Sequence, residues 1–154
     1  MTSNYQEIYS RFLAKIKDYD FLNYTEADAN ESMRGWLASS LSQPYVYRIF
    51  STFEPDDEIA NMVYTLKSTV NDYADKNFVE ELLSYQMICE WLRPKVQSTT
   101  TLHQMITNSK EQKFYSQQQH LQQLRDTLAD AEHKVRSMLR DRGYVYNSYL
   151  GNAQ

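Results

Sequence analysis

The side chains best suited to chemistry in this sequence are three histidines and one cysteine. His103, His120 and His133 are scattered, and no two of them share the i, i+4 spacing of a helical metal site, so we interpret them as surface residues. Cys89 would need a histidine beside it in space to act as a nucleophile. It lies in the most apolar segment of the chain, which predicts a buried and inert thiol.

An acidic cluster and the glycines are the remaining candidates for ligand binding. Asp56, Asp57 and Glu58 have the oxygen atoms that hard cations prefer, but the glycine and the spacing of a calcium loop are missing. We therefore interpret this cluster as a solvated turn. Only three glycines occur, too few for a loop that holds a phosphate. We expect no catalytic, metal-binding or cofactor-binding residues, and hence not an enzyme.

The composition indicates which elements must position the other side chains. Three glycines and three prolines among 154 residues leave few sites for tight turns, which favours long helices. A chain of this length fits one domain with a single core. We predict a mainly α fold, a helical bundle of about four to five helices.

Charge is distributed unevenly along the chain. Residues 1–90 carry 15 acidic and 7 basic side chains, a net charge of −8, whereas residues 91–154 carry 5 acidic and 9 basic ones, a net charge of +4. Oppositely charged ends favour head-to-tail association, which closes into a ring where the rotation permits. Two unrelated solvated surfaces are an equally good interpretation. The basic residues form no stripe suited to nucleic acid.

Targeting signals are missing from the sequence. It contains no run of about 18 apolar residues that would span a bilayer. The first 12 residues lack the charged start and apolar core of a signal peptide. We therefore expect synthesis in the cytoplasm and no membrane partner.

Two helices are predicted in the N-terminal third of the chain. Apolar residues at three- and four-residue spacing predict helices over about 5–17 and 26–42. Asn4 and Thr25 are suited to cap their first turns, each with an acidic residue three positions later.

The segment 45–70 is ambiguous. Residues 45–50 and 62–67 are β-prone and are separated by the polar residues 54–58, which favours a β-hairpin. A helix beginning near Pro55 also fits the spacing of the apolar residues. We favour the hairpin.

A central helix is predicted to begin after Asn77. Its apolar residues point in nearly every direction, which is typical of a buried helix. Pro94 should kink or end this helix near Trp91. Residues 98–101 are poor helix formers and predict a break, and residues 108–115 are predicted to form a loop.

The last predicted helix begins after a capping box at Ser116 and ends at Gly143, a suitable residue to follow a helix. Residues 1–143 would thus form one helical domain. Apolar residues along this helix alternate in three- and four-residue steps, as in a heptad repeat. We favour packing on the chain's own domain over an intermolecular coiled coil. This seam comprises Leu121, Leu124, Leu128, Ala131, Val135 and Met138.

Residues 144–154 are predicted to form a C-terminal docking arm. The segment is aromatic, whereas disordered ends are usually polar. Aromatic residues are enriched among binding anchors, and their alternation here suits strand addition or pockets on a partner. Folding back onto the chain's own core is the alternative. The predicted docking residues are Tyr144, Val145, Tyr146, Tyr149 and Leu150.

Three segments, in order, resemble the helical head-tail connector (adaptor) proteins of the tailed-bacteriophage neck. They are residues 8–22 (IYSRFLAKIKDYDFL), 87–95 (MICEWLRPK) and 114–124 (FYSQQQHLQQL). The resemblance implies a virion structural protein that forms a ring around the DNA channel, commonly of about twelve subunits. It also implies that a C-terminal extension binds the portal protein, and that DNA passes only as non-specific cargo.

Two further functions stay open. The β-prone segment 45–70 is larger than a minimal helical adaptor needs, and it would suit a stopper or tail-completion protein of the same neck. A regulatory or scaffolding protein would instead dimerise as a coiled coil through residues 121–138. The negative net charge of −4 is compatible with a channel wall past which DNA slides.

Overall fold

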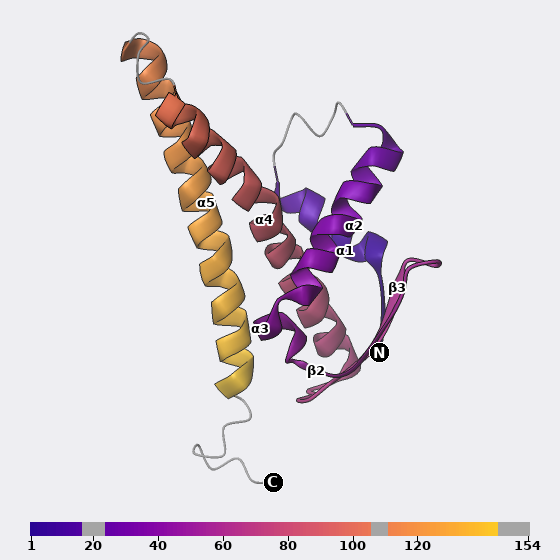
Figure 1. The fold of residues 1–154 in the computed structure, drawn as a ribbon. Helices are drawn as coiled ribbons and strands as arrows, with labels where there is room; N and C mark the ends of the chain where they lie inside the picture. Colours follow the sequence, from indigo (N-terminus) through magenta and orange to yellow (C-terminus); the bar gives the residue numbers. More distant parts are fainter. Residues whose placement is uncertain (17–23, 106–110, 145–154) are drawn as a thin grey trace.

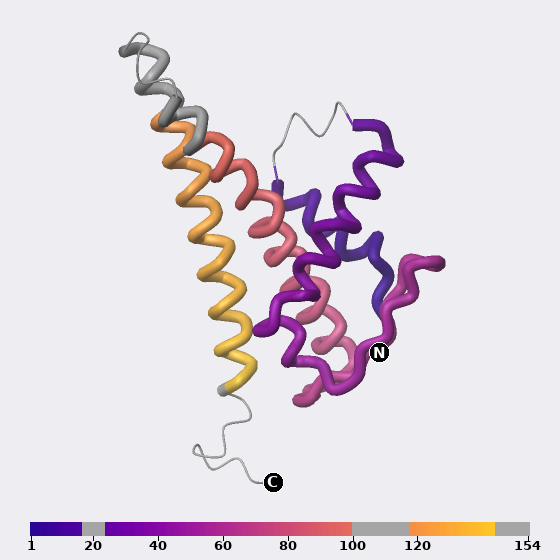
Figure 2. Tube along the Cα trace, in the orientation of Figure 1, coloured from indigo at the N-terminus to yellow at the C-terminus, as the bar shows by residue number. Residues whose placement is uncertain are grey.

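The computed structural model is mainly helical, which confirms the predicted fold class (Figure 1). Its described part contains five helices and one three-stranded antiparallel sheet. The structure describes residues 1–16, 24–105 and 111–144, and the side chains of residues 1–16, 24–99 and 118–143 (Figure 2).

Helices α1 (Tyr5–Lys15) and α2 (Glu26–Ser42) confirm the two predicted N-terminal helices. Asn4 Oδ1 accepts a hydrogen bond from a backbone N–H of the first turn of α1 at 2.7 Å. Thr25 Oγ1 accepts one from the backbone of Asp28 at 3.2 Å. These bonds satisfy donors that a helix start otherwise leaves free. The buried face of α1 consists of Tyr5, Ile8, Tyr9 and Phe12.

The predicted hairpin is present, and it belongs to a three-stranded sheet. Strands β2 (Phe50–Asp56) and β3 (Asn61–Leu66) pair antiparallel. Strand β1 (Thr2–Asn4) pairs antiparallel with the other edge of β3, so the order is β1-β3-β2. The sequence analysis missed β1, because three residues are too few to show an alternating pattern.

The first half of the predicted hairpin was assigned wrongly. Residues 44–47 form the short helix α3 (Pro44–Tyr47), and of the β-prone run 45–50 only Phe50 belongs to a strand. Pro44 at the first helical position fixes a helical φ and lacks only an N–H that would be unpaired there. The turn also buries Val46 completely. Both effects outweigh the β-propensity of the run.

Helix α4 (Asp72–Met105) is the buried central helix, although it begins earlier than predicted. The cap is Asn71, whose Oδ1 accepts a hydrogen bond from the backbone of Ala74 at 2.8 Å. Asn77 lies one turn inside and donates to the carbonyl of Tyr73 at 2.8 Å. Side chains from α1, α2, α5 and the sheet belong to the same core. The buried apolar residues of α4 are Val79, Leu82, Leu83, Met87, Ile88, Cys89 and Leu92.

The sequence predicted a kink or an end near Trp91, and the end is wrong, because α4 continues through Pro94 to Met105. Pro94 is exposed, so water can reach the carbonyl that loses its helical partner. The predicted break at residues 98–101 is also absent. There Thr99 Oγ1 donates to the Lys95 carbonyl at 2.8 Å, which satisfies the hydroxyl without ending the helix.

Helix α5 (Glu111–Tyr144) runs antiparallel beside α4 (Figure 1). The predicted cap at Ser116 is wrong, because the residue lies inside the helix, and residues 111–115 are helical rather than a loop. Glu, Gln and Lys at the start of α5 are good helix formers, which explains the earlier beginning. Gly143 is likewise inside α5 and does not end it.

Candidate functional site: an arginine pocket opposite an acidic turn

The residues first considered for chemistry are not brought together in the described part of the protein. His120 and His133 are exposed on α5, and the side chain of His103 lies outside the described ones. Cys89 is buried in α4, and this burial raises the pKa of its thiol to about 12. Among the described side chains, no group of three or more histidine, cysteine or acidic residues is placed to hold a metal ion.

The acidic turn, defined here as residues 54–59 with the sequence EPDDEI, comprises the exposed end of β2 and the first residues of the connection to β3. Asp56 Oδ1 accepts hydrogen bonds from the backbone of Glu58 at 3.1 Å and of Ile59 at 3.4 Å. Asp57 forms a 2.8 Å ion pair with Arg34 of α2. The turn is therefore tied both to itself and to the helical body.

The pKa of Asp57 is lowered, first by its hydrogen bond with Arg34 and then by that with Tyr5. The Tyr5 hydroxyl donates to Asp57 at 3.1 Å. By contrast, Glu54 and Glu58 are exposed, and neither forms an ion pair with a described side chain. Two carboxylates at the turn therefore remain available to a partner.

The seam along α5 packs within the chain. Leu121 and Val135 are buried, and Leu124, Leu128 and Met138 are partly buried against the hydrophobic core. These side chains face the domain's own interior. An intermolecular coiled coil would have to displace that packing.

The predicted docking arm lies almost wholly outside the described residues. Tyr144 is the last residue of α5, and its side chain is not among those described. Val145, Tyr146, Tyr149 and Leu150 belong to the segment 145–154, which is outside the described part. The docking role therefore stays a prediction.

The three segments that resemble phage connectors meet in one groove of about 780 Å³. The ring of Phe12, on α1, packs edge-on against Trp91 of α4, with centroids 6.2 Å apart. Helix α5 lines the other side of the groove. Each segment supplies part of its lining: Lys15 and Ile16 from the first, Ile88, Trp91 and Leu92 from the second, and His120, Gln123 and Leu124 from the third.

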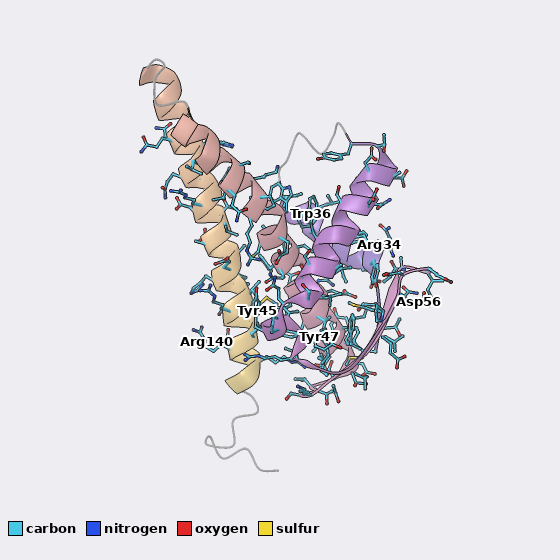
Figure 3. All side chains as sticks on the ribbon, viewed as in Figure 1. Arg34, Trp36, Tyr45, Tyr47, Asp56 and Arg140 are labelled. Atoms are coloured by element: carbon cyan, nitrogen blue, oxygen red, sulfur yellow. The ribbon has the colours of Figure 1, made fainter. Side chains whose placement is uncertain are left out.

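The arginine pocket is a second cavity, of about 640 Å³, between the α3 region, α4 and α5. Four arginines and a single acidic residue, Glu132, line it. Figure 3 shows Tyr45 and Arg140, from two of its walls, on the same side of the molecule. The four arginines are Arg48, Arg93, Arg136 and Arg140.

The floor of the arginine pocket is fixed by a hydrogen-bond network around Glu90. Glu90 Oε1 accepts from Arg93 at 2.7 Å, from Gln86 at 2.8 Å and from Gln43 at 3.0 Å. The Tyr45 hydroxyl donates to Gln86 at 3.1 Å. Burial alone would lower the pKa of Arg93, but hydrogen bonding with Tyr45 and the charge of Glu90 raise it overall. The floor is thus rigid and permanently charged.

The arginines at the rim of the pocket are more exposed than Arg93 in its floor. Arg48 is exposed and forms no ion pair with a described side chain. Arg136 is 77% exposed and pairs with Glu132 at 3.3 Å, and Arg140 is 58% exposed and pairs with its neighbour Asp141 at 3.4 Å. Exposed pairs of this kind contribute about 0–1 kcal/mol, so these guanidinium groups can exchange partners at little cost.

A buried ion pair joins the end of α5 to the start of α4. Asp75 is fully buried and pairs with Arg142, and both carboxylate oxygens also accept from the Val70 backbone at 3.1 Å. Arg142 further donates to the Ser68 carbonyl at 2.7 Å, and its guanidinium lies 4.4 Å from the centre of the Phe78 ring. The last turn of α5 is thereby fixed beside the sheet.

A second buried polar cluster surrounds Glu80 of α4. Its carboxylate accepts from Ser3 at 2.9 Å and pairs with Arg11 at 3.0 Å, while Lys76 lies 3.7 Å away. Burial, followed by the neighbouring Glu7, raises the pKa of Glu80. Sequence reasoning found neither this cluster nor the arginine pocket, because their members come from distant segments. Local signals are limited to i, i+4 spacings, of Lys76 with Glu80 in the cluster and of Arg136 with Arg140 in the pocket.

Comparison of the chain with protein-family models finds no match. Curated proteins likewise yield no match. Solved structures yield none either. None of the described helices, α4 and α5 included, is both long and apolar enough to cross a membrane.

Proposed function

We propose that this chain is a virion structural protein of a tailed bacteriophage, a head-tail connector (adaptor) that joins the portal to the rest of the neck. Its subunits would form a ring around the DNA channel. Its partners would be further copies of itself, the portal protein and other neck or tail proteins. It would be made in the host cytoplasm and would act in the virion.

The observation that carries this proposal is the meeting of the three resembling segments in one groove. They are separated by tens of residues in the sequence, yet Ile16, Trp91 and Leu124 line the same cavity. Their contact supports a resemblance of one structural unit rather than of three unrelated helices.

Electron microscopy together with light scattering tests the proposal. We expect the purified chain, alone or mixed with the portal protein of the same phage, to form rings with a central channel. A chain that stays monomeric or dimeric and does not bind the portal would overturn the proposal. A stable dimer in particular would favour the coiled-coil alternative, which otherwise must overcome the packing of the seam inside the chain.

The docking arm provides a separate prediction. Deleting residues 144–154 should leave the helicity and melting temperature of the isolated chain nearly unchanged, because we expect these residues to form an arm rather than part of the globular body. The same deletion should abolish binding to the portal. Circular dichroism and a pull-down with purified portal protein measure the two effects. A truncated chain that unfolds would show the arm to be part of the core, and one that still binds would remove its docking role.

A stopper or tail-completion protein of the same neck is the second candidate, favoured by the β2–β3 hairpin. The hairpin is a substantial addition to a helical body (Figure 1). Antibody labelling of virions distinguishes the two tiers. A label directly below the portal supports the adaptor, and a label further along the tail axis supports the stopper.

A further inference from the structure

The acidic turn and the arginine pocket are complementary in charge and lie on opposite sides of the protein. We propose that the acidic turn of one copy docks into the arginine pocket of a second copy, head to tail. The inference rests on the proposed function in one respect: the contact would join neighbouring subunits of the proposed ring.

The pocket has the chemistry to bind a carboxylate-rich turn. Guanidinium groups bind carboxylates through paired, charge-assisted hydrogen bonds. Arg48 and Arg140 are exposed at the rim. Arg48 forms no ion pair with a described side chain, and Arg140 is bonded to neighbours on its own helix, Asp141 at 3.4 Å and Ser137 at 3.3 Å. Between the charges, Val135 and Leu139 provide an apolar wall. The pocket therefore suits an acidic segment that also carries an apolar side chain.

The acidic turn has that composition. Glu54 and Glu58 are exposed and form no ion pair with a described side chain, and Ile59 is 62% exposed between the strands. Asp56 and Asp57 are instead held by backbone donors and by Arg34. The turn is thus ordered before it binds, which lowers the entropy lost on docking.

The geometry requires two copies. Figure 3 shows Asp56 at one side of the molecule and Arg140 at the other, with the helical body between them. A turn cannot reach the pocket of its own chain across that body. Different surfaces on the two partners make a heterologous contact, which repeats from copy to copy and closes into a ring where the rotation permits.

The size of the turn predicts a weak single contact. A stable interface buries about 800 Å² on each partner, more than six residues of a turn provide. We therefore expect each docking event to be weak at low protein concentration, and to gain strength when a ring closes or a portal holds neighbouring copies together.

Sedimentation velocity of the full chain at low salt tests the contact. We expect the charge reversals Arg48→Glu and Arg140→Glu in the pocket, and Glu58→Lys in the turn, each to weaken self-association about tenfold or more. Lys134→Glu on α5 and Glu31→Lys on α2 are matched controls, exposed in the structure and outside both surfaces, and should change it less than about twofold. Circular dichroism establishes that every variant is folded.

Mixing two defective variants gives a sharper test. R48E/R140E retains an intact turn, and E54Q/E58Q retains an intact pocket. Each alone should be monomeric, and the mixture should form a one-to-one dimer that grows no further, because only one intact contact is possible. Because a single contact is expected to be weak, the mixture is measured at protein concentrations well above those at which the wild-type chain associates, and a mixture that stays monomeric there would overturn the head-to-tail contact.

Crosslinking locates the contact directly. A bismaleimide should join P55C on one chain to D141C on another, since these exposed positions lie beside the docking residues and leave Glu58 and Arg140 in place, whereas P55C with D126C, elsewhere on α5, should give no dimer. Equal crosslinking of both pairs, or of neither, would overturn the inference.

Portal binding is measured separately. If the chain binds the portal but fails these tests, the proposed function stands and the contact is overturned. If it passes these tests but does not bind the portal, the contact stands and the proposed function is overturned.

Discussion

At the scale of single residues, we expect the ion pair between the Arg142 guanidinium and Asp75 to have the largest effect on stability. Asp75 is fully buried, so removing the cation leaves a buried carboxylate without a counter-charge, held only by the Val70 backbone N–H among the described donors. We expect Arg142→Ala to lower the free energy of unfolding by about 3–5 kcal/mol. Arg136→Ala, on the exposed side of the same helix, should change it by less than about 0.5 kcal/mol. Urea denaturation measures both, and equal effects would contradict the buried pair.

Three buried groups that are uncharged at neutral pH should make the free energy of unfolding fall at alkaline pH: the hydroxyls of Tyr5 and Tyr9 and the thiol of Cys89. Burial raises the pKa of Tyr5, Tyr9 and Cys89 to about 12, from ordinary values of 10.0 for the tyrosines and 9.0 for the thiol. The folded state therefore holds these protons more tightly than the unfolded state. Their contribution is fully present below about pH 9 and is lost as the pH rises towards about 12.

Urea denaturation across this pH range is the measurement. We expect the free energy of unfolding to fall steadily from pH 9 upwards. A Cys89→Ala variant, which removes one of the three groups, should show a shallower fall from its own neutral-pH value. A curve that is flat to pH 11 would contradict the burial of all three.

At the scale of elements, Pro94 tests how α4 tolerates a missing hydrogen bond. Because the helix continues through Pro94, an alanine there can donate to the carbonyl four residues earlier and removes the clash of the ring. We expect Pro94→Ala to raise the free energy of unfolding by about 1–3 kcal/mol.

Gly35→Ala on α2 is the matched reference for this prediction. A Cβ at Gly35 would meet nothing within 4 Å, so the change tests helix propensity alone and should add about 0.5–1 kcal/mol. Chemical denaturation compares the two variants. If Pro94→Ala is destabilising while Gly35→Ala is stabilising, the local shape that proline imposes on α4 is required for packing.

Local signals in the sequence predicted elements well and long-range contacts poorly. The signals that predicted elements correctly act within a few residues along the chain. They are the caps Asn4 and Thr25, the polar residues between β2 and β3, and the apolar residues of α4. The bond from Ser3 to Glu80 and the pair of Asp75 with Arg142 join residues more than 60 positions apart. No periodicity encodes such contacts.

The errors at helix ends have one physical cause. Pro94 and Gly143 predict helix ends and Ser116 predicts a helix start, but Pro94 and Ser116 lie inside long helices and α5 continues one residue past Gly143. α4 and α5 pack against each other along their length, and this tertiary contact outweighs local costs of about 1–3 kcal/mol. Arg142, fixed by Asp75, holds the final turn around Gly143 in place.

At the scale of the whole molecule, the uneven charge predicts association that depends on salt. Residues 1–90 carry a net charge of −8 and residues 91–154 one of +4. We expect the self-association constant to fall as salt rises from low concentration to 1 M, where screening acts over about 3 Å. Sedimentation velocity at constant protein concentration measures it. Association of equal strength at both salt concentrations would exclude a role of charge between subunits.

The position of the Asp75–Arg142 pair determines how the protein would bear a mechanical load. A pull on the chain beyond α5, along the axis of that helix, reaches Arg142 first and passes through Asp75 to α4, the centre of the core. Because α4 and α5 run antiparallel and converge at the end away from Arg142 (Figure 1), such a force acts along the helix pair and slides one helix along the other instead of peeling it away. Many contacts must then rupture together, so the protein should yield at a higher force along this axis than when α5 is pulled sideways.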